Sequence, residues 1–175
     1  MRTTKEHLAT PHITTDQHVK NSVVELGLSL DGKIAVYLDA RFWIILRKAS
    51  LSESPEPAAI ELLGLLRTLV AQGKLFCPAS EGVFFELLKQ SDPQSRLATA
   101  RLIDELSLGV TLLNMEARVA TELSRFFHML TYNEDRLHPI RHLVWSKLAY
   151  VLGFLHPTST PFDARTERAV QKAFF

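Results

Sequence analysis

The segment "GKIAVYLDARFWIILRKAS", residues 32–50, decides how the rest of the chain is interpreted. Its uninterrupted apolar run from Ile34 to Leu38 predicts a buried strand, and such a run is typical of a parallel strand covered on both faces. Asp39 ends the run, and an apolar helical pattern follows directly over residues 40–49. The sequence therefore places a single carboxylate where a strand ends and a helix begins.

The rest of the chain alternates between strand and helix patterns. Two further strands are expected, "KLFCP" at residues 74–78 and "VTLLN" at 110–114. Apolar periodicity and capping residues predict helices over residues 56–72, 80–90, 92–107, 114–130, 140–153 and 163–174. This order indicates an α/β fold that is rich in helix, with a small parallel sheet, right-handed crossovers and helices on both faces.

The length of 175 residues suits one domain with its own core. Residues 1–20 are polar and show little pattern, so we expect a flexible N-terminal arm there. Residues 21–175 are expected to form the domain itself.

Composition excludes several classes of protein. The chain has 20 Lys and Arg against 19 Asp and Glu, so the net charge of +1 gives no global electrostatic attraction to nucleic acid or to an anionic membrane. Cys77 is the single cysteine, which excludes an internal disulfide and a zinc site built on several thiolates, and we expect it to be a buried structural thiol. No secretory signal and no apolar run of about 18 residues occurs, so a cytoplasmic protein without a membrane span is expected.

Two carboxylates carry the chemical hypothesis. Asp39 lies at the carboxyl end of the first predicted strand, and Glu86 lies in the helix after the second. In open α/β sheets, ligands bind outside the carboxyl ends of the strands, so the two side chains are candidates for one site. Carboxylates brought together repel each other unless a cation lies between them. Mg²⁺ or Mn²⁺ would suit such ligands and could activate water for phosphodiester cleavage.

Structural roles are the alternative for these acids. Asp39 could serve only as the N-cap of the helix that begins at residue 40, and Glu86 could be a solvated helix residue. Glu116, just after the third predicted strand, is a further candidate for a third metal ligand, whereas Glu81 is better interpreted as an acid favoured in the first turn of its helix. His138 and His142 have helical spacing, but two histidines are too few for a zinc site.

The segments "AVYLDARFWIILRKA", "GKLFCPASEGVFFELLKQ" and "VTLLNMEARVATELSRF" together resemble the first part of a PIN-like domain, over about residues 33–130. The resemblance implies a three-layer PIN-like fold with strand order 3-2-1-4-5. It also implies a Mg²⁺- or Mn²⁺-dependent endoribonuclease that cleaves RNA, with Asp39 and Glu86 as catalytic metal ligands. Many such domains are the toxins of toxin–antitoxin pairs, so an antitoxin protein is an implied partner.

The second half of the chain departs from that family. Residues 140–162 contain no acid, the next aspartate is Asp163, and no fourth or fifth strand is evident. We therefore expect an incomplete domain, either the N-terminal part of a longer protein or a shortened product. The alternative function is a degenerate or truncated PIN-like domain without catalysis that acts as a protein-interaction module. An unpaired first strand would also predict homo-oligomers through the exposed sheet edge.

Overall fold

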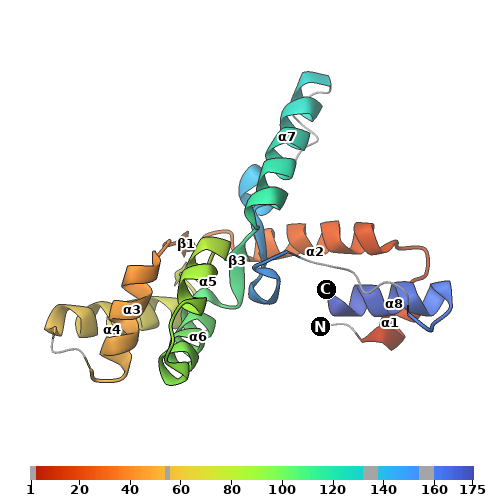
Figure 1. Cartoon of the computed structure of the whole chain (residues 1–175). Coiled ribbons are helices and arrows are strands. Elements are labelled where there is room, and N and C mark those ends of the chain that lie inside the picture. Colours follow the sequence, from red (N-terminus) through yellow and green to blue (C-terminus); the bar gives the residue numbers. More distant parts are fainter. Residues whose placement is uncertain (1–2, 54–55, 132–137, 154–159) are drawn as a thin grey trace.

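A computed structural model describes residues 3–53, 56–131, 138–153 and 160–175, and helices dominate it (Figure 1). The longer helices are α2 (Thr15–Ser29), α3 (Ala40–Ser50), α4 (Pro57–Ala71), α5 (Glu81–Leu88), α6 (Pro93–Ser107), α7 (Met115–Thr131) and α8 (Ala164–Phe174). The short elements are the helix α1 (Thr4–Leu8), the strands β1 (Ile34–Ala35), β2 (Leu75–Phe76), β3 (Val110–Leu112) and β4 (Trp145–Lys147), and the 3-10 turns η2 (Ile140–His142) and η3 (Leu148–Tyr150).

The strands form two small sheets, a parallel pair of β1 with β2 and an antiparallel pair of β3 with β4. Strand β1 pairs with β2, with Ile34 opposite Leu75, and a parallel bridge between Ala79 and Thr111 joins the chain after β2 to β3. The fourth strand, β4, pairs antiparallel with β3. The parallel sheet is therefore small, and one bridge after β2 links it to the antiparallel pair.

Alternate side chains of β2 point into two different apolar clusters. Leu75 belongs to the main core with residues of α3, α4, α5 and α6. Phe76 belongs to a second cluster with Leu30 and Val110, against which Trp145 packs. Helices thus cover one face of β2, and the end of α2 contributes to the other, which confirms a helix-rich α/β arrangement around a small parallel sheet.

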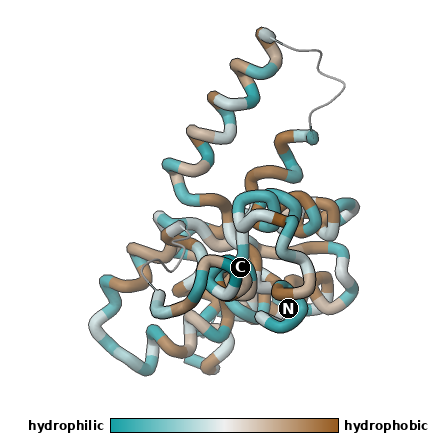
Figure 2. Tube along the Cα trace, turned by 90° about the vertical axis from the view of Figure 1, so that its right-hand side faces the viewer, coloured by the Kyte–Doolittle hydropathy of each residue, from teal (hydrophilic) through white to brown (hydrophobic). Residues whose placement is uncertain are grey.

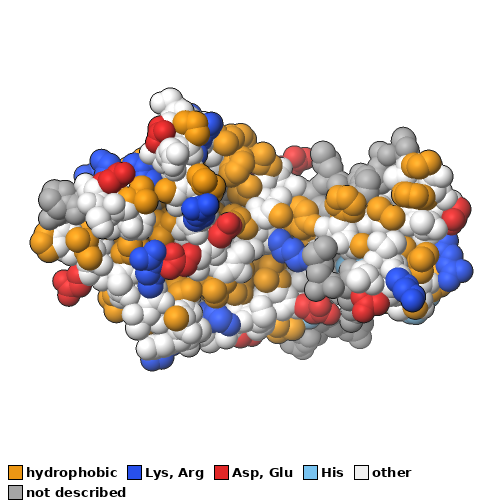
Figure 3. Space-filling view, turned by 90° about the horizontal axis from the view of Figure 1, so that it is seen from below, with side chains coloured by type: hydrophobic (Ala, Val, Ile, Leu, Met, Phe, Trp, Pro, Cys, Tyr) orange, Lys and Arg blue, Asp and Glu red, His pale blue; other side chains and the backbone are white. Residues whose placement is uncertain are grey.

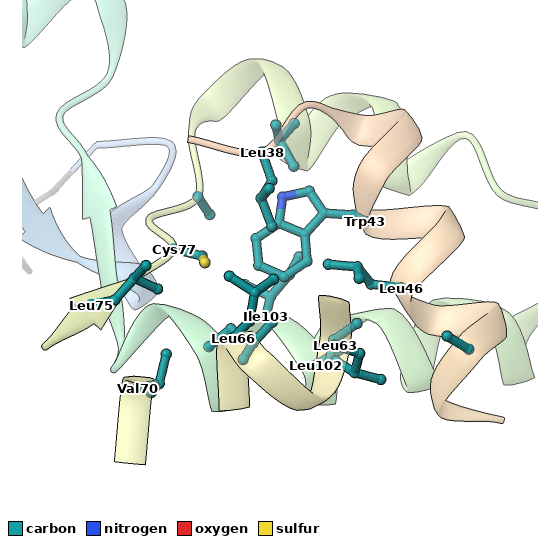
Figure 4. Close-up of a cluster of buried hydrophobic side chains, with 14 of the residues drawn as sticks. Leu38, Trp43, Leu46, Leu63, Leu66, Val70, Leu75, Cys77, Leu102 and Ile103 are labelled. Atoms are coloured by element: carbon teal, nitrogen blue, oxygen red, sulfur yellow. The ribbon is translucent and has the colours of Figure 1, made fainter. Parts of the chain in front are cut away.

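Trp43 occupies the middle of the main core (Figure 4). Its side chain is fully buried, as is that of Leu46 one turn further along α3. The indole lies among apolar side chains from α4, α6 and the segment just after β2, among them Leu66, Ile103 and Cys77. Of the two apolar segments on either side of Asp39, α3 therefore contributes side chains to the main core, whereas β1 lies outside it.

The first strand differs from its prediction. Only Ile34 and Ala35 form strand, and Ile34 is 65% exposed instead of buried on both faces. The cause is its place at the edge of the sheet, where β2 is its one partner among the described strands. The N–H groups of Ile34 and Val36 donate to the carbonyls of Lys74 and Phe76 at 2.9 and 3.0 Å, and Leu38 alone of the predicted run is buried.

The helix predicted from Ile140 to near Gly153 is wrong. The chain there forms η2, β4 and η3, so a fourth strand exists, although it is antiparallel and lies beside β3. Pairing with the open edge of β3 outweighs the local helical pattern, because it satisfies backbone groups that would otherwise be buried without partners. The Trp145 ring also packs edge-to-face on Phe76, with ring centroids 5.2 Å apart.

The segment predicted to be an N-terminal arm contains α1 and the start of α2, and it packs against α8. Lys172 of α8 is 2% exposed, and its ammonium donates to the carbonyls of His7, Thr10 and Ile13 at 2.9–3.4 Å. This buried cation therefore joins α8 to the backbone of residues 7–13. Helices α1 and α8 thus lie side by side (Figure 1).

Helix α7 is confirmed as a helix, and Asn114 caps it by accepting a hydrogen bond from the Ala117 N–H at 3.0 Å. Its position is unusual, because none of its residues is buried. The helix projects away from the other elements (Figures 1 and 2).

Candidate functional site at the carboxyl edge of the sheet

A hollow of about 620 Å³ lies where the first three strands end. Tyr37 follows β1, Ser80 and Glu81 follow β2 at the start of α5, and Leu113 follows β3. Arg118 from the first turns of α7 also lines it. The topology therefore forms a hollow at the edge where α/β sheets bind ligands.

Two side-chain contacts fix the polar part of this hollow. The Tyr37 hydroxyl and the Ser80 Oγ lie 3.0 Å apart, which joins the end of β1 to the start of α5. The Glu81 carboxylate accepts a hydrogen bond from the Met115 N–H at 3.0 Å and thereby joins α5 to the start of α7. An acid at the N-termini of two helices is also favoured by their dipoles, so the structural role expected for Glu81 agrees with its contacts.

Asp39 lies at the predicted position, directly between the β1 segment and α3. It is exposed, and its Oδ1 accepts a hydrogen bond from the Phe42 N–H at 3.0 Å, so it is the N-cap of α3. Asp39 therefore has the capping role that the sequence offered as the alternative to metal binding. It occupies one carboxylate oxygen, and a carboxylate has further lone pairs for another ligand.

Glu86 and Glu116 are exposed acids on different helices. Glu86 lies in the second turn of α5, and its Oε1 is 2.6 Å from the ammonium of Lys89. Glu116 lies in the first turn of α7. Neither lines the hollow, nor does Asp39, whereas Glu81 does. Across the described part of the chain, no group of three or more Asp, Glu, His or Cys side chains is placed to hold a metal ion.

The two candidate histidines do not share a helix face. His138 precedes Pro139 outside any helix, and His142 is buried in η2. The His142 Nε2 is 2.9 Å from the Asp31 Oδ1, at the end of α2. The Cys77 thiol is buried, and burial raises its pKa to about 11, which agrees with a structural rather than a nucleophilic thiol.

The Asp31–His142 pair gives a pH-dependent prediction. The hydrogen bond with His142, helped by Arg141, holds the pKa of Asp31 below its usual value. A carboxyl with a lowered folded-state pKa stabilises the fold above its unfolded pKa, and this contribution is lost as the pH falls through the folded value. We expect Asp31→Asn to destabilise the protein at neutral pH, and the difference from wild type to shrink below about pH 4. Urea unfolding over a pH series measures this.

Asp104→Asn, at an exposed position of α6, is the control for that series. If both variants depended on pH in the same way as wild type, the Asp31–His142 contact would have no role in stability.

Comparison with protein-family models, with curated proteins and with solved structures gives no match to this chain. A search of the described helices finds none that is both long and apolar enough to span a membrane.

Sequence reasoning missed three residues of the hollow: Tyr37, Glu81 as a lining residue, and Arg118. Tyr37 was counted as part of the apolar run, although its hydroxyl at the end of β1 could have suggested a polar contact. The contact of Glu81 with residue 115 spans 34 positions of sequence, so no local pattern reports it.

Proposed function

We propose that the chain is a PIN-like endoribonuclease that uses Mg²⁺ or Mn²⁺ to cleave RNA. One observation carries the proposal: Asp39 follows a strand that pairs in parallel with β2, and the chain after β2 makes a parallel bridge to β3, which is compatible with the first three strands of that family. The Tyr37–Ser80 contact holds the ends of β1 and β2 at one edge. Asp39 and the start of α5, the helix that contains Glu81 and Glu86, therefore lie at the same edge of the sheet.

The donor set suits a hard cation that keeps much of its water. Mg²⁺ is commonly held by one or two carboxylates together with water and substrate phosphate oxygens. Asp39 is the principal ligand in this proposal, Glu86 is the second, and Glu116 is a weaker candidate. Glu86 would have to leave Lys89, and that exposed ion pair is of a kind that contributes little energy.

A bound ion would supply an activated water and neutralise charge that develops on the phosphate. The residues that line the hollow would bind the RNA and take no part in activating the water. Arg118 lines the hollow and offers a guanidinium charge for an RNA phosphate. Charges of both signs alternate over the face in Figure 3, so RNA binding would depend on such local contacts.

Asp39→Asn separates the metal role from the cap, because asparagine caps a helix about as well as aspartate. We expect wild type to cleave single-stranded RNA when Mn²⁺ is present, and Asp39→Asn to lose this cleavage while keeping its fold. Asp92→Asn is the matched control, since Asp92 is also an exposed N-cap, of α6. Equal cleavage by wild type and Asp39→Asn, or none by wild type, would remove the nuclease proposal.

The second candidate is a PIN-like module without catalysis that binds a protein partner. The exposed apolar side chains of α7 favour it, since such surfaces mark interaction sites. In a toxin–antitoxin pair, an antitoxin would be that partner. An inactive wild type that retains its fold would leave this module as the better proposal.

A further inference from the structure

Helix α7 presents an apolar stripe to solvent along its whole length. The residues of the stripe are three or four positions apart, except for one adjacent aromatic pair: Met115, Val119, Leu123, Phe126, Phe127 and Leu130. Each is exposed, up to 70% for Leu130. The opposite side of the helix is the half-buried side, where the Arg125 guanidinium donates to the His138 carbonyl at 2.8 Å.

The apolar area of the stripe is larger than that of the isolated apolar side chains found on most protein surfaces. An exposed large apolar side chain offers on the order of 200 Å², so six that are between 48% and 70% exposed present roughly 700 Å². That exceeds the roughly 300–600 Å² of the largest apolar patch on a typical monomer. It approaches the roughly 800 Å² that each partner buries in a stable complex.

We propose that this stripe, which we call the α7 face, binds the α7 face of a second copy of the chain in an antiparallel dimer. A twofold interface needs a surface that is complementary to itself. The α7 face meets this condition, because the bulky Phe126 and Phe127 lie towards one end and the slimmer Val119 lies towards the other. With the twofold axis beside Leu123, Val119 of each copy lies opposite Phe127 of its partner.

An antiparallel arrangement also suits the helix dipoles, since each N-terminus lies beside the C-terminus of the other copy. A parallel arrangement would place the bulky aromatic pairs against one another at one end of the interface. The β1 edge, where the sequence predicted self-association, offers only two paired residues. The α7 face is therefore the larger surface for a second copy.

Sedimentation equilibrium of the full chain tests the dimer, with Leu123→Glu as the disruptive variant. Two charges would face each other at the axis, so we expect association at least about tenfold weaker than in wild type. Leu97→Glu is a close control, because Leu97 is a helical leucine exposed to 52%, against 51% for Leu123. A monomeric wild type, or equal weakening by both variants, would overturn the proposal.

Cysteine cross-linking tests the orientation independently of nuclease activity. The single native cysteine, Cys77, is buried, so a new surface cysteine is the accessible thiol under mild copper-catalysed oxidation by air. We expect Leu123→Cys to form a disulfide-linked dimer. We also expect Val119→Cys mixed with Phe127→Cys to link faster than either variant alone. Faster linkage of Phe127→Cys with itself would contradict the antiparallel arrangement.

Discussion

Trp43→Ala is expected to lower the free energy of unfolding by about 4 kcal/mol. The Trp43 side chain is fully buried and lies between α3 and the helices α4 and α6, so its removal leaves a cavity that several elements border. The loss combines the transfer of a large apolar group with the contacts that the surrounding atoms no longer make. Because small domains have only about 5–15 kcal/mol of stability, this is a large fraction of the total.

Chemical denaturation followed by far-UV circular dichroism measures this loss. Phe42→Ala is the natural control, since Phe42 is the neighbouring aromatic residue and is 45% exposed, and we expect it to cost about 1 kcal/mol or less. Trp43→Phe should cost less than Trp43→Ala, because phenylalanine fills most of the space and the indole Nε1 has no hydrogen-bond partner in the described structure. Equal losses from Trp43→Ala and Phe42→Ala would show that the core is not centred on Trp43.

Gly27→Ala is expected to cost about 3 kcal/mol through overpacking. Gly27 is buried in α2, and three backbone atoms of His142 lie within 2.7 Å of the position that a new Cβ would take. Backbone atoms cannot rotate away as a side chain can, so α2 and η2 would have to separate. That movement would also strain the Asp31–His142 contact at the end of α2.

Gly64→Ala is the matched control for that substitution. Gly64 lies in the middle of α4, and nothing lies within 4 Å of the position that its new Cβ would take, so alanine should stabilise the helix by roughly 0.5–1 kcal/mol. Thermal unfolding of both variants gives the comparison. If Gly27→Ala were as stable as wild type, the close packing of α2 on η2 would be wrong.

Local signals in the sequence identified most of the helices. Each predicted helix start with a side-chain cap accepts hydrogen bonds from backbone N–H groups two or three residues further on, at Asp39, Ser80, Asp92, Asn114 and Asp163. These caps were predictable because the side chain and its partners are neighbours in the sequence.

The features that the sequence did not predict depend on contacts between residues that are far apart in the sequence. The pattern of residues 140–153 is compatible with a helix, but the open edge of β3 draws Trp145–Lys147 into an antiparallel strand. Likewise, Lys172 is an ordinary helical lysine in sequence, and its burial depends on carbonyls about 160 residues away. Neither partner can be inferred from spacing alone.

The candidate site likewise combines a feature that local sequence predicts with contacts that it does not predict. The position of Asp39 after the first strand was predictable, since it follows from a strand pattern and its immediate neighbour. The contacts that form the hollow, between Tyr37 and Ser80 and between Glu81 and Met115, join segments 34 or more positions apart. The apolar pattern of α7 predicted a helix correctly, but a pattern alone does not distinguish a face packed in a core from one that is exposed.

Mn²⁺ binding by Asp39 is the most direct test of the proposed function. Electron paramagnetic resonance of free Mn²⁺, titrated with wild type, Asp39→Asn and Asp92→Asn, measures the affinity without requiring the RNA substrate. We predict that wild type and Asp92→Asn bind Mn²⁺ equally, and that Asp39→Asn binds at least about tenfold more weakly. Equal affinity in all three proteins, or no binding by wild type, would contradict the assignment of Asp39 as a metal ligand.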